Sequence, residues 1–200
     1  MSEVTRRDLV RIAMAVTAAG GAIDVASAQH VHQAAADVKA SEGGVYKPKA
    51  LNDHEYATLR RLAELIVPAD DHSPSALEGG ACEFIDLLCS HNDQLSVIYT
   101  GGIFWLDREM QGRYGANFVD AKPDQQTAML DLIAYRTNAK AHPELGPGIN
   151  FFHWARMMIV DGFYTSKPGI ADVGYMGNKG MAKFEIPQEA IDYALKRSPV

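Results

Sequence analysis

Apolar residues recur at helical spacing in the middle of the chain. Between Leu59 and Ile66 they stand at positions i, i+3, i+4 and i+7, which is the pattern of one buried helix face. Asn52 lies before this run, and Glu55 follows Asn52 by three residues. This pair predicts a capped helix that begins here. Pro68 predicts the end of the helix, because proline lacks the amide hydrogen that would continue it.

Similar patterns predict further helices. They cover residues 81–89, residues 93–113, a segment that begins near Pro123, residues 149–163, and a short terminal helix over 187–196. The pair Gly101-Gly102 lies inside the second of these and predicts a close helix contact or a kink. No long run alternates apolar and polar residues, so an extensive sheet is not expected. We therefore expect an all-α fold with a single helical domain over residues 51–165.

The chain changes character after this domain. Between residues 162 and 186, glycines alternate irregularly with aromatic and apolar side chains, and the spacing fits neither a helix nor a strand. We expect an irregular C-terminal arm rich in glycine and aromatic residues over 166–200, which ends in the short helix. Aromatic and Met side chains are enriched at protein interfaces, so we assign partner binding to Trp154, Phe163, Tyr164, Tyr175 and Met176. The alternative is that the arm covers this chain's own helices, and the two roles are compatible.

The N-terminus has the pattern of an export signal. Arg6-Arg7 is followed by apolar residues and a further base, which matches the twin-arginine pattern. The Ala- and Gly-rich apolar run that follows is shorter than the roughly 20 residues of a membrane-spanning helix. Ala26-Ser27-Ala28 is a small-x-small site of the kind that signal peptidase cuts. We expect residues 1–28 to be a removable twin-arginine signal; the alternative is an amphipathic helix that contains an arginine pair by coincidence.

Residues 29–50 contain Ala, Gly, Lys and His without clear periodicity, and we expect a linker or an extended arm there.

The net charge of −6 argues against nucleic-acid binding, because no excess of basic side chains would offset phosphate repulsion.

The sequence shows no recognisable catalytic, cofactor or metal motif. His30 and His32 are the only close histidine pair, and neither His-Glu-x-x-His nor Cys-x-x-Cys occurs. Dinucleotide, phosphate-loop and nucleophile-elbow patterns are also absent from the sequence. Asp70-Asp71-His72 has acid–base side chains, but its place in a polar loop favours a solvated cluster. We therefore expect no catalytic residues, metal or cofactor in this chain.

The two cysteines, Cys82 and Cys89, lie seven residues apart in one predicted helix. Their Cα atoms would be about 10.5 Å apart, beyond the limit of about 7 Å for a disulfide. We favour two buried thiols. The alternative is pairing across a break in the helix or with a partner chain.

Four segments together resemble a known family. Residues 62–71, Leu-Ala-Glu-Leu-Ile-Val-Pro-Ala-Asp-Asp, are similar to the helix and Ile-x-Pro-x-Asp opening of the gluconate 2-dehydrogenase subunit 3 family. Residues 83–88, Glu-Phe-Ile-Asp-Leu-Leu, follow at the expected distance, and residues 162–166 and 169–178 resemble the C-terminal pattern of that family. The resemblance covers about residues 50–195.

The resemblance implies a small, non-catalytic subunit that works with a large FAD-containing dehydrogenase subunit of the glucose-methanol-choline type. It also implies a multihaem cytochrome c as a frequent third subunit, and membrane association through the complex. The large subunit of such complexes typically lacks an export signal, so the small subunit is expected to carry it, folded, through the twin-arginine translocase into the periplasm. The substrate class would be a sugar, a sugar acid or a glycoside. The family has no motif of catalytic residues that could be assigned to positions in this sequence.

Two other classes of function remain as alternatives. An independent periplasmic enzyme would contain a metal or a coloured cofactor when purified alone. A free-standing periplasmic protein that binds a small ligand would be a stable monomer with a preformed pocket.

Overall fold

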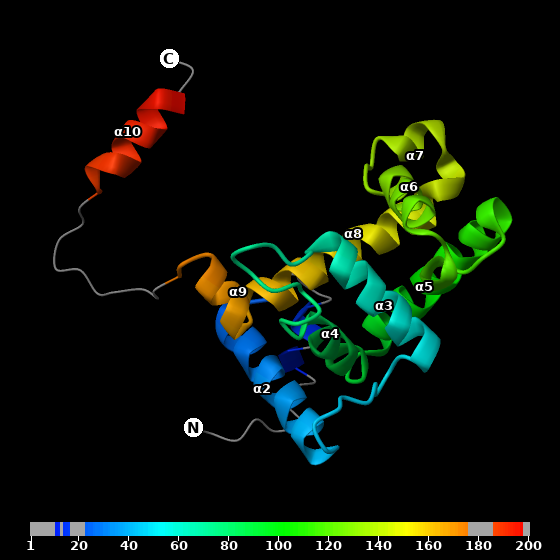
Figure 1. Cartoon of the computed structure of the whole chain (residues 1–200), viewed down its shortest axis with the longest axis horizontal. Coiled ribbons are helices and arrows are strands. Elements are labelled where there is room, and N and C mark those ends of the chain that lie inside the picture. The colour runs from blue at the N-terminus through cyan, green and yellow to red at the C-terminus, as the bar shows by residue number, and fades with distance from the viewer. Residues whose placement is uncertain (1–10, 13, 17–22, 176–185, 198–200) are drawn as a thin grey trace.

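The computed structural model describes residues 11–12, 14–16, 23–175 and 186–197, and the regular elements in these residues are all helices (Figure 1). They are α2 (Val25–Ser41), α3 (Asp53–Ile66), α4 (Ala81–Cys89), α5 (Asp93–Tyr114), η1 (Phe118–Asp120), α6 (Pro123–Ile133), α7 (Asn138–Ala141), η2 (Pro143–Leu145), α8 (Gly146–Tyr164), α9 (Lys167–Asp172) and α10 (Gln188–Arg197). The prediction of an all-α fold is confirmed.

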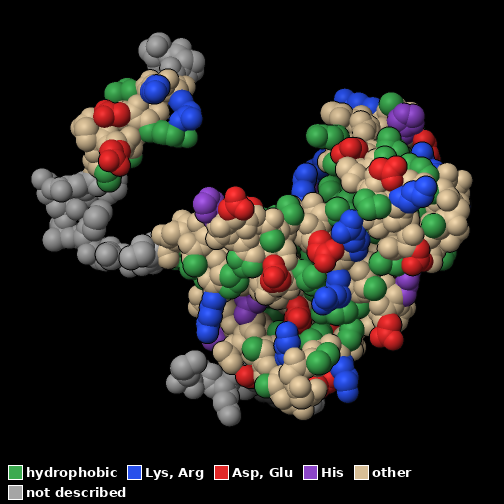
Figure 2. Space-filling model, in the orientation of Figure 1, with side chains coloured by type: hydrophobic (Ala, Val, Ile, Leu, Met, Phe, Trp, Pro, Cys, Tyr) green, Lys and Arg blue, Asp and Glu red, His purple; other side chains and the backbone are tan. Residues whose placement is uncertain are grey.

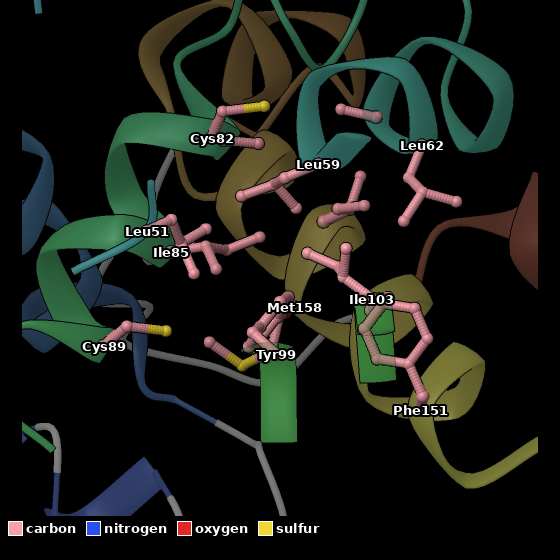
Figure 3. Close-up of a cluster of buried hydrophobic side chains, with 14 of the residues drawn as sticks. Leu51, Leu59, Leu62, Cys82, Ile85, Cys89, Tyr99, Ile103, Phe151 and Met158 are labelled. Carbon is pink, nitrogen blue, oxygen red and sulfur yellow. The ribbon is translucent and has the colours of Figure 1, made fainter. Parts of the chain in front are cut away.

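Helix α8 is the centre of the packing. It contacts α3, α4, α5 and α6, and α2 packs against α4 (Figure 1). Leu59, Ile85, Ile103 and Met158 bring α3, α4, α5 and α8 together in one buried cluster (Figure 3). Burial of each such side chain contributes about 1.5–3 kcal/mol before the entropy cost of ordering is counted.

The predicted beginning of α3 is confirmed by its hydrogen bonds. The Glu55 amide donates to the Asn52 side-chain oxygen over 2.9 Å, and the Asn52 amide donates to the Glu55 carboxylate over 2.9 Å. This reciprocal pair forms a capping box and satisfies two backbone donors that the first helical turn leaves free.

Asp86 on α4 holds the segment that leads into α3. Its carboxylate is fully buried and accepts hydrogen bonds from the Tyr46 hydroxyl (2.9 Å) and from the amides of Lys49 (2.6 Å), Ala50 (3.1 Å) and Leu51 (2.9 Å). Four donors therefore satisfy the oxygen atoms of one buried carboxyl group. The irregular stretch before α3 is fixed to the core by this side chain.

The prediction of a linker or extended arm over 29–50 is wrong for the part that α2 occupies. Ala28, Val31 and Ala35 lie at helical spacing on one face of α2 and are buried, and α2 packs against α4. This face consists mostly of alanine and has weak contrast with the polar face, so the sequence pattern did not reveal it. The chain leaves the helix at Gly43 and Gly44, which both adopt positive φ angles.

The region after residue 162 is also more regular than expected. Helix α8 continues to Tyr164, and α9 forms a short helix whose N-cap is Ser166. The Gly169 amide donates to the Ser166 hydroxyl over 3.3 Å. A Cβ at Gly169 would lie 2.8 Å from the Tyr164 Cα atom, so glycine is required for the turn between the two helices. The predicted short terminal helix is confirmed as α10.

Candidate functional site

Of the residues assigned to partner binding, the four that the structure describes differ in burial and position. Trp154 is half-buried near the middle of α8, and Tyr164 is exposed at its end, about 15 Å farther along the helix axis. Tyr175 is exposed after α9, and Met176 lies outside the described residues. The side chain of Phe163 is only 1% exposed, so Phe163 belongs to the core and is not available to a partner.

Trp154 lies beside a groove between α5 and α8. Ile98, Gly101 and Trp105 line it from α5, and Pro147 and Trp154 line it from α8, around a volume of about 210 Å³. The two indole side chains therefore border one hollow although 49 residues separate them in the chain.

Close packing beneath this groove holds the two helices together. A Cβ at Gly148 would lie 2.6 Å from Cε3 of Trp105 and nearer still to two other atoms of that ring. A Cβ at Gly102 would lie 2.8 Å from the Phe151 Cβ atom. Both glycines are buried, so the α5–α8 contact depends on the absence of side chains at these positions. The predicted close contact at the glycine pair is confirmed for Gly102, whereas the space in front of Gly101 is open.

The outer side of α5 exposes large apolar side chains next to the groove. Val97 is 68% exposed and Phe104 is 71% exposed, and they stand at i and i+7 on the same helix face with Gly101 between them. We call Val97, Gly101, Phe104, Trp105 and Trp154 the α5 face. Exposed apolar side chains grouped on one surface, with tryptophans beside a hollow, are typical of a protein–protein interface.

The sequence assignment missed Val97 and Phe104. The buried residues of α5 include Leu95, Ile103 and Met110, which define the core side of the helix. Val97 and Phe104 lie away from that side at helical spacing. Apolar residues on the helix side opposite to the core positions are the sequence signal that could have identified Val97 and Phe104.

A second and larger groove runs along α2. It is lined by α2, by Gly79 and Gly80, and by residues 165–168 at the start of α9, and its volume is about 1130 Å³. His32 faces the end of α8: its Nε2 atom lies 3.1 Å from the Thr165 hydroxyl, and its ring lies 4.8 Å from that of Phe84. Burial lowers the pKa of His32 to about 4, so the imidazole is neutral at physiological pH.

Other reactive side chains lie where the sequence suggested. Cys82 and Cys89 are free and buried, and burial raises the pKa of both thiols, so they stay protonated core residues. Asp70 is exposed and accepts hydrogen bonds from the amides of His72 and Ser73, both over 2.8 Å, which lower its pKa. The Asp70-Asp71-His72 segment is therefore a solvated turn.

Charged side chains of both signs are interspersed over the face of the molecule shown in Figure 2. Among the described residues, no group of three or more His, Cys, Asp or Glu side chains is arranged to hold a metal ion. Within the same residues, no helix has the length and apolar character needed to cross a bilayer.

A comparison with protein-family models agrees with the resemblance of the four segments. The family model for gluconate 2-dehydrogenase subunit 3 matches residues 53–182, a range that runs from the beginning of α3 past the end of α9. Neither the curated proteins nor the solved structures contain a match to this chain. Since the family model covers well over half of its length, the chain belongs to the gluconate 2-dehydrogenase subunit 3 family, whose members are small subunits of sugar-acid dehydrogenase complexes.

Proposed function

We propose that this chain is the non-catalytic small subunit of a periplasmic, FAD-dependent dehydrogenase of the glucose-methanol-choline type. It binds the folded flavoprotein subunit, stabilises it and carries it through the twin-arginine translocase. The substrate of the complex is a sugar, a sugar acid or a glycoside, and a cytochrome c completes the complex. Family membership supports the partnership, and the Arg6-Arg7 pattern supports the export role.

The observation that carries the proposal is the α5 face. A subunit needs a surface whose burial against its partner is energetically favourable. Phe104 is an aromatic side chain with most of its area in solvent. Its burial against a partner would contribute about 1.5–3 kcal/mol. Gly101 leaves space between Val97 and Phe104, so a partner side chain can enter the groove beside Trp105 and Trp154. Tryptophans at the centre of an interface commonly carry much of its binding energy.

Helix α10 supports a second contact. It has no buried residue, and Ala190, Ile191, Ala194 and Leu195 lie on one side of it. An isolated helix of this length is marginal in water, because nucleation is costly and few hydrogen bonds follow. Packing of its apolar side on the partner would stabilise it, as expected for a C-terminal arm that clasps the large subunit.

The test is co-purification of the tagged chain from its native host, with absorbance spectra and mass spectrometry of the material. We expect a larger protein with a flavin spectrum. Phe104→Glu should reduce its recovery at least about tenfold, because a charge would be buried at the interface. Tyr135→Glu is the matched control, since Tyr135 is 63% exposed but lies outside the α5 face. Equal recovery with both variants would show that the α5 face is not the interface.

A colourless chain that purifies alone would contradict the subunit proposal. The groove along α2 favours one second candidate, a free-standing periplasmic protein that binds a small ligand, because a volume of about 1130 Å³ can accommodate one. A ligand found in the solitary chain by mass spectrometry under native conditions would support this second candidate.

A further inference from the structure

The signal-peptidase pattern at Ala26-Ser27-Ala28 is part of a folded helix. Helix α2 begins at Val25, so the three residues lie in its first turn. Asp24 is the N-cap, and its carboxylate accepts a hydrogen bond from the Ser27 amide over 3.0 Å. The side chain of Ala28, the residue after which the peptidase would cut, is 0% exposed.

Residues before the pattern also contact the domain. Val16, from the apolar run that follows the arginine pair, is 1% exposed, and Ile12 and Ile23 pack against the same core. These three apolar side chains are therefore covered at least in part by the protein itself.

Peptidases bind their substrates in an extended conformation, with side chains next to the cut seated in pockets of the enzyme. Cleavage after Ala28 would first require the beginning of α2 to unfold, which breaks the Asp24 cap and exposes Ala28. His32 lies one turn after Ala28 on α2, and its ring packs on Phe84 of α4. This contact keeps that part of α2 against α4.

We infer that the folded chain protects this site and keeps its N-terminal segment. The protected site is Ala26-Ser27-Ala28, and the enzyme that it resists is signal peptidase. The inference rests on the proposed function only in that export would bring the chain to this enzyme. After export, residues 1–28 would then stay attached to the small subunit.

The test treats the purified full-length chain with purified signal peptidase in detergent and follows the intact mass, which starts at 21.8 kDa. A Gly-Ser insertion of about six residues between Ala28 and Gln29 releases the site from α2, because such segments are flexible. The matched control has the same insertion between Gly43 and Gly44, where both residues have positive φ and open surroundings. A synthetic peptide of residues 1–35 shows whether the enzyme accepts the sequence itself.

We expect the natural chain and the control to be cut at least about tenfold more slowly than the chain with the insertion after Ala28, while the peptide is cut readily. Rapid cleavage of the natural chain after Ala28 would overturn the inference. Resistance of the peptide and of the released site would overturn it too, because the helix would then not be the cause of protection. This assay does not depend on export, so a failure of the export proposal, seen as a chain confined to the cytoplasm, would be distinguished from a failure here.

Discussion

His32 couples the stability of the α2 contact to pH. Its pKa is lowered to about 4 in the folded chain, chiefly by burial, against about 6.5 in an unfolded chain. The unfolded state therefore binds a proton first as the pH falls, and the folded state loses stability between about pH 6.5 and pH 4. The loss through this residue should be about 2 kcal/mol, after allowance for its partial exposure.

The measurement is urea unfolding of the purified chain between pH 7 and pH 4.5. His32→Gln should remove most of this pH dependence, because Gln has no proton to gain in this range. His30→Gln is the matched control, since His30 is exposed on the same helix and should retain the slope. An unchanged slope in His32→Gln would show that the ring does not remain neutral and buried in the fold.

At the scale of elements, the contact between α5 and α8 predicts opposite changes in stability when two adjacent glycines are replaced by alanine. A Cβ at Gly102 would overlap the Phe151 side chain, and overpacking of this kind costs about 1–3 kcal/mol. Gly101 has no neighbouring atom within 4 Å of its added Cβ, and alanine is preferred to glycine inside a helix by about 1 kcal/mol. Gly102→Ala should therefore destabilise the chain, and Gly101→Ala should stabilise it.

The midpoints of urea unfolding at pH 7 measure both changes, and each variant is the control for the other because they differ by one position in the same helix. Stabilisation by both substitutions would mean that helix propensity, and not the packing of α5 on α8, determines the result.

At the scale of the whole molecule, the proposed export of the complex would depend on the arginine pair of this chain. Arg6→Lys combined with Arg7→Lys should leave both subunits in the cytoplasm, because the translocase recognises the arginine pair. Dehydrogenase activity in the periplasmic fraction should fall to the level of a strain without this chain. Arg11→Lys is the control, since it retains the pair. Periplasmic activity in the double variant would contradict the export role.

Local features of the sequence determined a large part of this fold. The Asn52–Glu55 capping box, the proline at the beginning of α6 and the strong apolar period of α3 act within a few residues, so the helices that they define were predicted near their observed ends. The ordered motifs also identified the family, which the family model confirmed. The partner-binding residues and the export role stay predictions.

Tertiary structure decided the features that depend on what each segment packs against. The alanine-rich face of α2 is recognisable only against α4, and Phe163 is a core residue because its ring packs against Gly79 in the loop before α4. Exposure of Val97 and Phe104 depends on which sides of α5 the other helices cover. Capping and periodicity are local properties that a sequence contains in full, whereas burial and exposure are set by contacts between distant segments, and these exist only once the chain has folded.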